Sequence, residues 1–149
     1  MLVTSQLLEL VVRSRGGRSG RLALVARLPS GATFIVFGLG KFVAHATETA
    51  SFQRYGLPSP SAFVYAVGIL EVVGGMLLIL GLLVRPTTLV LAGNMVGAIV
   101  TAGRIDGGAI NLGLAPALLV AMIALAWVGA GEPSIDIRLA AAVARRRLA

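Results

Sequence analysis

Four long apolar segments, separated by short polar connections, dominate this sequence of 149 residues. A helix needs about 20 mostly apolar residues to cross the hydrocarbon core of a bilayer, and each segment is close to that length. Only 13% of the residues are charged, whereas soluble domains carry nearer a quarter. Short connections make consecutive helices antiparallel neighbours. The sequence therefore predicts an all-α fold, an integral membrane bundle of four antiparallel transmembrane helices, with spans at about 22–43, 62–83, 87–102 and 109–128.

Basic residues concentrate outside these spans and set the expected orientation. The net charge is +7, but most of the arginines lie in a basic, partly flexible N-terminal segment, 1–21, and in a basic tail, 129–149. We interpret them as flanks facing anionic lipid, so no nucleic-acid partner is expected. The positive-inside rule places both termini in the cytoplasm. A cleaved signal ending at Ala44, His45 and Ala46 is the alternative, although Lys41 and the later spans favour retention of the first helix.

The sequence contains no cysteine and a single histidine, His45. Disulfides, thiolate metal sites and a haem held by two histidines of one chain are thereby excluded. No metal site, no catalytic residue and no covalently bound cofactor are predicted. Any electron carrier must be a bound molecule or belong to a partner, because the sequence shows no electron carrier of its own. We expect a non-catalytic or co-catalytic subunit rather than an enzyme that acts alone.

Glu71 lies near the middle of the second expected span. A carboxylate at this depth costs roughly 2.5–3.5 kcal/mol, so it should face the bundle interior and have a partner. We predict a polar centre in which Glu71 pairs with Lys41 or Arg104, with His45 nearby. The same residues are our tentative quinone-binding set. A role of Glu71 as structural glue between helices stays open, as does a merely solvated His45. Further candidate partners are Asn94, Thr101 and Asn111.

The third and fourth spans carry two packing signals. Gly93 and Gly97 form a G-x-x-x-G pair, which lets another backbone approach closely. Packing within the bundle is the simpler interpretation, and a homo-oligomer interface is the alternative. Pro116 lies inside the fourth span and is expected to kink it or to leave a carbonyl free.

A set of residues in the first two spans and their loop carries a family resemblance. It consists of Arg27, Gly38, Lys41, Phe52, Gly56-Leu57-Pro58, Gly68-x-x-Glu71-x-x-Gly74-Gly75, Gly81 and Arg85. In order and spacing these residues resemble the DoxX family of small bacterial membrane proteins, over about 22–128. Members often carry a histidine near the end of the third helix, where this chain has Thr101 to Arg104. Any role tied to that histidine does not transfer.

The resemblance implies a four-helix bundle in the bacterial plasma (inner) membrane and a link to redox metabolism. Some members are membrane subunits of thiosulfate:quinone oxidoreductase, and others resemble scaffolds that join a superoxide dismutase to a sulfurtransferase. Carried over by position, Glu71 has Lys41 and Arg27 as candidate basic partners. We expect a membrane subunit of a redox-linked assembly that anchors soluble or membrane redox proteins and binds a quinone near Glu71. A scaffold, assembly protein or small transporter without a redox role is the alternative.

Overall fold

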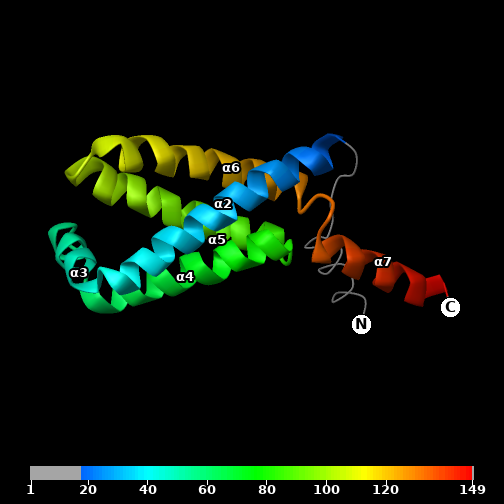
Figure 1. Ribbon diagram of the computed structural model, residues 1–149, viewed down its shortest axis with the longest axis horizontal. Coiled ribbons are helices and arrows are strands. Elements are labelled where there is room, and N and C mark those ends of the chain that lie inside the picture. The colour runs from blue at the N-terminus through cyan, green and yellow to red at the C-terminus, as the bar shows by residue number, and fades with distance from the viewer. Residues whose placement is uncertain (1–17, 149) are drawn as a thin grey trace.

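The computed structural model describes residues 18–148, and most of the predicted N-terminal segment lies outside them. All regular elements of the described chain are helical, which confirms the predicted all-α bundle. Long helices pack side by side, the short helix α3 (His45–Arg54) lies across one end, and α7 (Ile135–Leu148) leaves the other (Figure 1). We call these the α3 end and the tail end. The remaining elements are α2 (Arg18–Val43), α4 (Pro60–Leu80), α5 (Val84–Ala98), η1 (Ile99–Gly103), η2 (Ile110–Leu114) and α6 (Ala115–Val128).

Four stretches of helix in the described residues are long and apolar enough to cross a membrane. They are Ser19–Val43, Pro60–Leu80, Val84–Gly103 and Ile110–Val128. Large apolar side chains such as Leu22, Leu89 and Val120 are exposed on their outer surfaces. In water such surfaces would be unfavourable, whereas hydrocarbon tails solvate them, so the outer face of this bundle fits a bilayer.

The connection between the second and third spans differs from the prediction. The second span was expected at about 62–83 and the third from 87, but α4 ends at Leu80 and α5 already begins at Val84, with Arg85 and Pro86 in its first turn. Gly81 stops α4 because its φ of 67° is left-handed, a conformation that glycine adopts without strain. A proline in a first helical turn loses no hydrogen bond, so Pro86 starts α5 instead of breaking a helix.

Glycines bring α2 and α4 into backbone contact. Gly31 lies against Gly75, and Gly38 lies against Gly68, so two glycines spaced seven apart on each antiparallel helix meet in pairs. A Cβ at Gly75 would lie 2.6 Å from the Gly31 carbonyl oxygen, which no side chain tolerates. Gly68 and Gly75 of the second span therefore form part of the packing surface between α2 and α4, whereas Gly74 lies against Leu91 of α5.

Gly93 and Gly97 do not pack in this way. A Cβ at either position would meet no atom within 4 Å, and both residues are exposed. The expectation that they pack helices within the bundle was wrong, because α5 separates from α4 toward the α3 end (Figure 1). Contact of these glycines with a second copy stays a prediction.

Pro116 is accommodated without a break in the fourth span. The span begins as a π-helical turn, η2, and becomes α-helical at Ala115, directly before the proline. Widening the helix by a π turn is a common way to absorb a missing backbone N–H. The third span ends in a second π turn, η1, so both helices are irregular at the α3 end.

The tail end is closed by two buried charged residues. The Arg27 guanidinium is 1% exposed and donates hydrogen bonds to the carbonyls of Ala130 and Pro133. Asp136 accepts hydrogen bonds from the first amides of the α5 turn, Leu83 N at 2.8 Å and Val84 N at 3.0 Å. The expectation that Arg27 partners Glu71 was therefore wrong, since Arg27 fastens the start of the tail to the bundle.

Candidate functional site

Glu71 is held between two helices in the bundle interior. Its Oε2 accepts a 2.7 Å hydrogen bond from Lys41 Nζ on α2, and its Oε1 accepts a 2.9 Å bond from Asn94 Nδ2 on α5. The side chains of Lys41 and Glu71 are 13% and 5% exposed. An ion pair at this depth is favourable only if its remaining hydrogen-bonding groups are satisfied, and Asn94 contributes to that. We call these three residues the polar centre.

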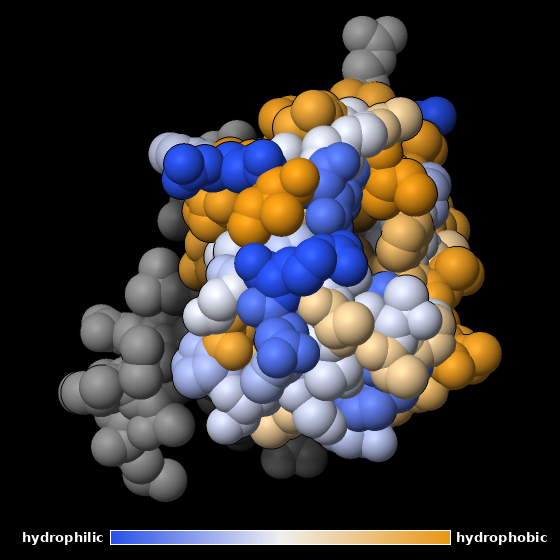
Figure 2. All heavy atoms as spheres, turned by 90° about the vertical axis from the view of Figure 1, so that its left-hand side faces the viewer, coloured by the Kyte–Doolittle hydropathy of each residue, from blue (hydrophilic) through white to orange (hydrophobic). Residues whose placement is uncertain are grey.

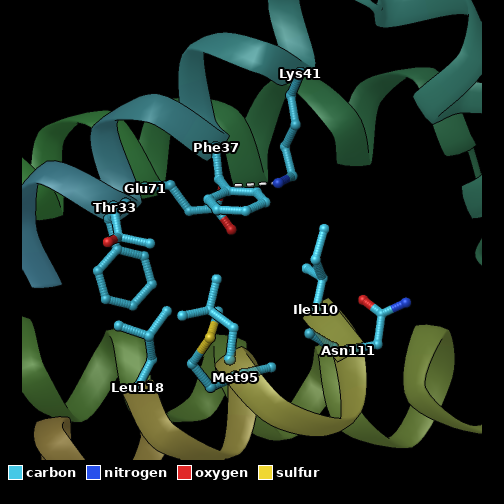
Figure 3. Close-up of a pocket in the computed structure, with 12 residues that line it drawn as sticks. Thr33, Phe37, Lys41, Glu71, Met95, Ile110, Asn111 and Leu118 are labelled. Carbon is cyan, nitrogen blue, oxygen red and sulfur yellow. Dashed lines mark hydrogen bonds and ion pairs between the residues drawn. The ribbon is translucent and has the colours of Figure 1, made fainter. Parts of the chain in front are cut away.

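The polar centre opens onto a cavity of about 550 Å³. That volume lies within the usual range for small-molecule sites. A smaller cavity of about 100 Å³, closer to Phe34 and Leu118, shares Lys41 and Glu71 in its wall. Figure 3 draws the residues that line this smaller cavity, with Lys41 extending toward Glu71 beside Phe37, and Ile110 and Asn111 on the facing helix. The large cavity is lined by Phe37, Lys41, Glu48, Ser51, Phe52, Tyr55, Leu57, Phe63, Val67, Glu71, Gly93, Asn94, Gly97, Ala98, Thr101, Ala102, Asp106, Ile110 and Asn111.

The cavity lining changes character along its length. At the polar centre, a lysine ammonium and a carboxamide can bind a ligand carbonyl, because the ammonium has three donors and uses one on Glu71. Phe37 lies beside the polar centre (Figure 3), and Phe52 of α3 and Phe63 near the start of α4 line the wall closer to the α3 end. This arrangement of apolar walls with a few convergent polar groups is typical of sites that bind small organic molecules.

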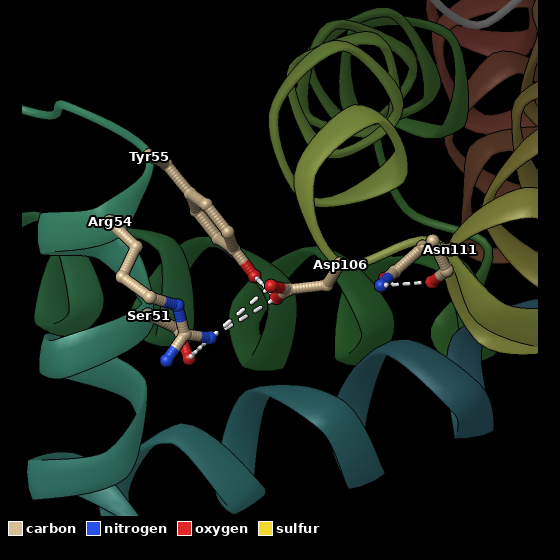
Figure 4. Close-up of polar contacts among 6 residues, drawn as sticks. Ser51, Arg54, Tyr55, Asp106 and Asn111 are labelled. Atoms are coloured by element: carbon tan, nitrogen blue, oxygen red, sulfur yellow. Dashed lines mark hydrogen bonds and ion pairs between the residues drawn. The ribbon is translucent and has the colours of Figure 1, made fainter.

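At the α3 end, the loop after α3 is tied to the turn between η1 and η2. The Tyr55 hydroxyl donates to Asp106 Oδ2, and Arg54 Nη2 lies 3.3 Å from Asp106 Oδ1 (Figure 4). Burial, and next the hydrogen bond to Asp106, raises the pKa of Tyr55 to about 12. We call these three residues the latch, since they join α3 to the opposite side of the cavity. Hydrophilic side chains gather across this end of the molecule (Figure 2).

Two residues predicted for the polar centre do not join it. His45 stacks on Tyr65 with ring centroids 4.2 Å apart, and its Nε2 lies 3.0 Å from Ser61 Oγ. Arg104 is exposed, and neither residue lines the cavity. Arg104 follows the π turn η1 and lies at the protein surface, so among the described residues Lys41 provides the positive charge beside Glu71.

Sequence reasoning missed the latch. Neither Asp106 nor Tyr55 was predicted as a site residue. The sequence does place a carboxylate in one short connection and an arginine and a tyrosine in another. That these two connections meet can be known only from the three-dimensional structure.

Comparison with known proteins places this chain in a family. The DoxX family model matches residues 22–104, which is more than half of the chain. "Uncharacterized membrane protein Rv3486" of Mycobacterium tuberculosis is 35% identical over 127 residues, covering 76% of this chain and 78% of that protein. "Putative oxidoreductase CatD" of Bacillus subtilis is 37% identical over 78 residues, covering 52% of this chain and 57% of that protein. No solved structure matches significantly. On the strength of the family match and the four-helix bundle, the chain belongs to the DoxX family.

Proposed function

We propose that this protein is the membrane subunit of a redox-linked assembly and that its cavity binds a quinone at the polar centre. The observation that carries the proposal is the 550 Å³ cavity, which joins aromatic walls to the Lys41 ammonium. A quinone needs an apolar slot for its ring and a hydrogen-bond donor at a carbonyl oxygen. One DoxX relative bears the name of an oxidoreductase, which agrees with this reading.

In this proposal Lys41 and Asn94 hold the ring, and Phe37 and Phe52 flank it. The Lys41 ammonium stays next to Glu71 while a second of its hydrogens is directed to the ligand. Electrons come from a partner protein, since the chain has no cysteine and one histidine to hold a redox centre. The positive-inside rule puts the tail end, and with it the docking side for a cytoplasmic partner, in the cytoplasm of the bacterial plasma membrane.

A scaffold without a ligand is the second candidate, and one observation favours it. Both carboxylate oxygens of Glu71 are already bonded, to Lys41 and to Asn94, so the polar centre could serve only to join α2, α4 and α5. Such interhelical bonds are a known means of helix association in membranes. A protein that acts only as a scaffold does not need the cavity beside the polar centre.

The test is to purify the protein in mild detergent from its native membrane and to analyse copurifying lipids and proteins by mass spectrometry. The informative variant is Lys41→Met with Glu71→Gln, which removes both charges together and so leaves no unpaired charge inside the bundle. Arg104→Met is the matched control, because it removes a basic residue at the same end without altering the cavity wall.

Quinone that copurifies with the wild type and with Arg104→Met, but not with the double variant, supports the proposed site. Equal quinone in all three proteins contradicts it. Partner proteins that copurify without quinone, and are unaffected by the double variant, favour the scaffold.

A further inference from the structure

The large cavity comes close to the outside of the protein on two sides, and these two sides are lined by different kinds of side chain. The side at the α3 end is polar, with Glu48, Ser51 and the latch residues Tyr55 and Asp106 in its lining. On this side the latch bonds join the loop after α3 to the turn before η2. A ligand arriving from water would pass among these polar residues.

The side between α4 and the continuous α5–η1 helix is apolar. Val67 and Phe63 line it from α4, Phe63 being 40% exposed, and Gly97 faces them from α5. A Cβ on Gly97 would touch nothing within 4 Å, so no side chain fills the space there. Within the described residues, the one hydrogen bond between the side chains of α4 and α5 is the Asn94–Glu71 bond of the polar centre. Between that bond and the α3 end, no side-chain hydrogen bond among the described residues joins α4 to α5.

This open side lies at hydrocarbon depth. Val67 is seven residues from the start of the span Pro60–Leu80, and Gly97 is six residues from the end of Val84–Gly103. At 1.5 Å of rise per residue, both lie about 10 Å below the α3 end of their spans. Because the hydrocarbon core is about 30 Å thick, that depth is within the lipid tails rather than the headgroups.

We propose that the cavity opens into the bilayer between α4 and the α5–η1 helix, and that its ligand is an amphipathic lipid. Its ring or head lies at the polar centre, and its apolar tail leaves through the opening between Val67 and Gly97. This inference rests on the proposed quinone site and adds to it the entry route and the need for a tail. A tail lying along apolar walls and among lipids gains burial that a water-soluble ligand of the same head would lack.

The experiment compares a naphthoquinone ring without a side chain and the same ring with a long prenyl chain, each bound to the full chain in lipid nanodiscs and counted by native mass spectrometry. Gly97→Leu narrows the opening, and Val67→Phe narrows it from the opposite wall. Gly40→Leu is the matched control, since a Cβ at Gly40 also meets nothing within 4 Å and Gly40 does not line the cavity.

We expect Gly97→Leu and Val67→Phe to weaken binding of the prenylated ring at least tenfold and binding of the bare ring less than threefold, with Gly40→Leu unchanged for both. Equal weakening of both ligands, or no weakening of either, overturns the lateral opening and leaves the ring site standing. A wild type that binds neither ligand overturns the quinone site and the opening together.

Discussion

Replacing Lys41 by methionine tests how strongly the polar centre holds α2 to α4. Methionine keeps most of the length of the lysine side chain but removes its charge, so Glu71 is left with Asn94 as its one hydrogen-bond partner in the polar centre. Because Glu71 is 4% exposed, water cannot replace the lost partner fully. The structure therefore predicts a large loss of stability from a single substitution that changes little volume.

The magnitude follows from the burial of the pair. Removing one partner of a buried ion pair costs about 3–5 kcal/mol, and we expect about 3 kcal/mol because Lys41 is 13% exposed at the cavity wall. At about 2–4 °C per kcal/mol for a chain of this size, Tm should fall by about 6–12 °C. Adding Glu71→Gln to Lys41→Met removes the stranded charge, so the double variant should return to within about 1 kcal/mol of the wild type.

The assay is thermal unfolding in one detergent, followed by circular dichroism, for the wild type, both single variants and the double variant. The four values form a double-mutant cycle, whose coupling energy isolates the interaction between the two side chains. A coupling energy near zero, with the losses of the single variants simply adding, would refute the view that Lys41 and Glu71 stabilise one another.

Three other predictions come from different parts of the structure. Gly75→Ala should lower stability by about 2 kcal/mol in thermal unfolding, because its methyl group would clash with the backbone of α2, whereas Gly40→Ala should not. Asp136→Ala removes the cap of α5 and should cost about 1–2 kcal/mol; protease cleavage of the tail should also become faster, and unchanged cleavage would argue against this docking. Tyr55, measured by its absorbance change, should ionise near pH 12, and Asp106→Asn should bring this pKa closer to 10. Since the folded-state pKa is raised, the stabilisation it brings is complete below pH 10 and is lost between pH 10 and 12; ionisation of Tyr55 near pH 10 in the wild type would contradict the latch.

The transmembrane helices and the interior position of Glu71 could be predicted because both depend on local chain properties. An apolar run long enough to cross the bilayer must form a helix to satisfy its own backbone, whatever surrounds it. A carboxylate in the middle of such a run must face inward and find a partner. Neither conclusion requires knowledge of which helices are neighbours.

Partner choice depended on geometry between helices. Arg27 and Lys41 lie on the same first helix, and the family resemblance suggested both as partners of Glu71. Arg27, however, lies at the tail end and binds Ala130 and Pro133. The Gly93 and Gly97 pair matches a packing motif, but it lines the cavity wall, and a Cβ at either position would contact no neighbouring helix. A G-x-x-x-G motif permits close approach of a second helix, but it does not show that a second helix lies there.

The sequence by itself determined that this protein lies in a lipid bilayer, that it has four helical spans and that it contains a buried carboxylate. These properties follow from hydrophobicity and backbone hydrogen bonding, which act within each segment. Only the tertiary structure decided that Lys41 rather than Arg104 neutralises Glu71, that Asp136 caps α5 and that a cavity opens beside the polar centre. These features depend on where helices far apart in the sequence meet, and that is set by the sum of many weak packing contacts across the whole bundle.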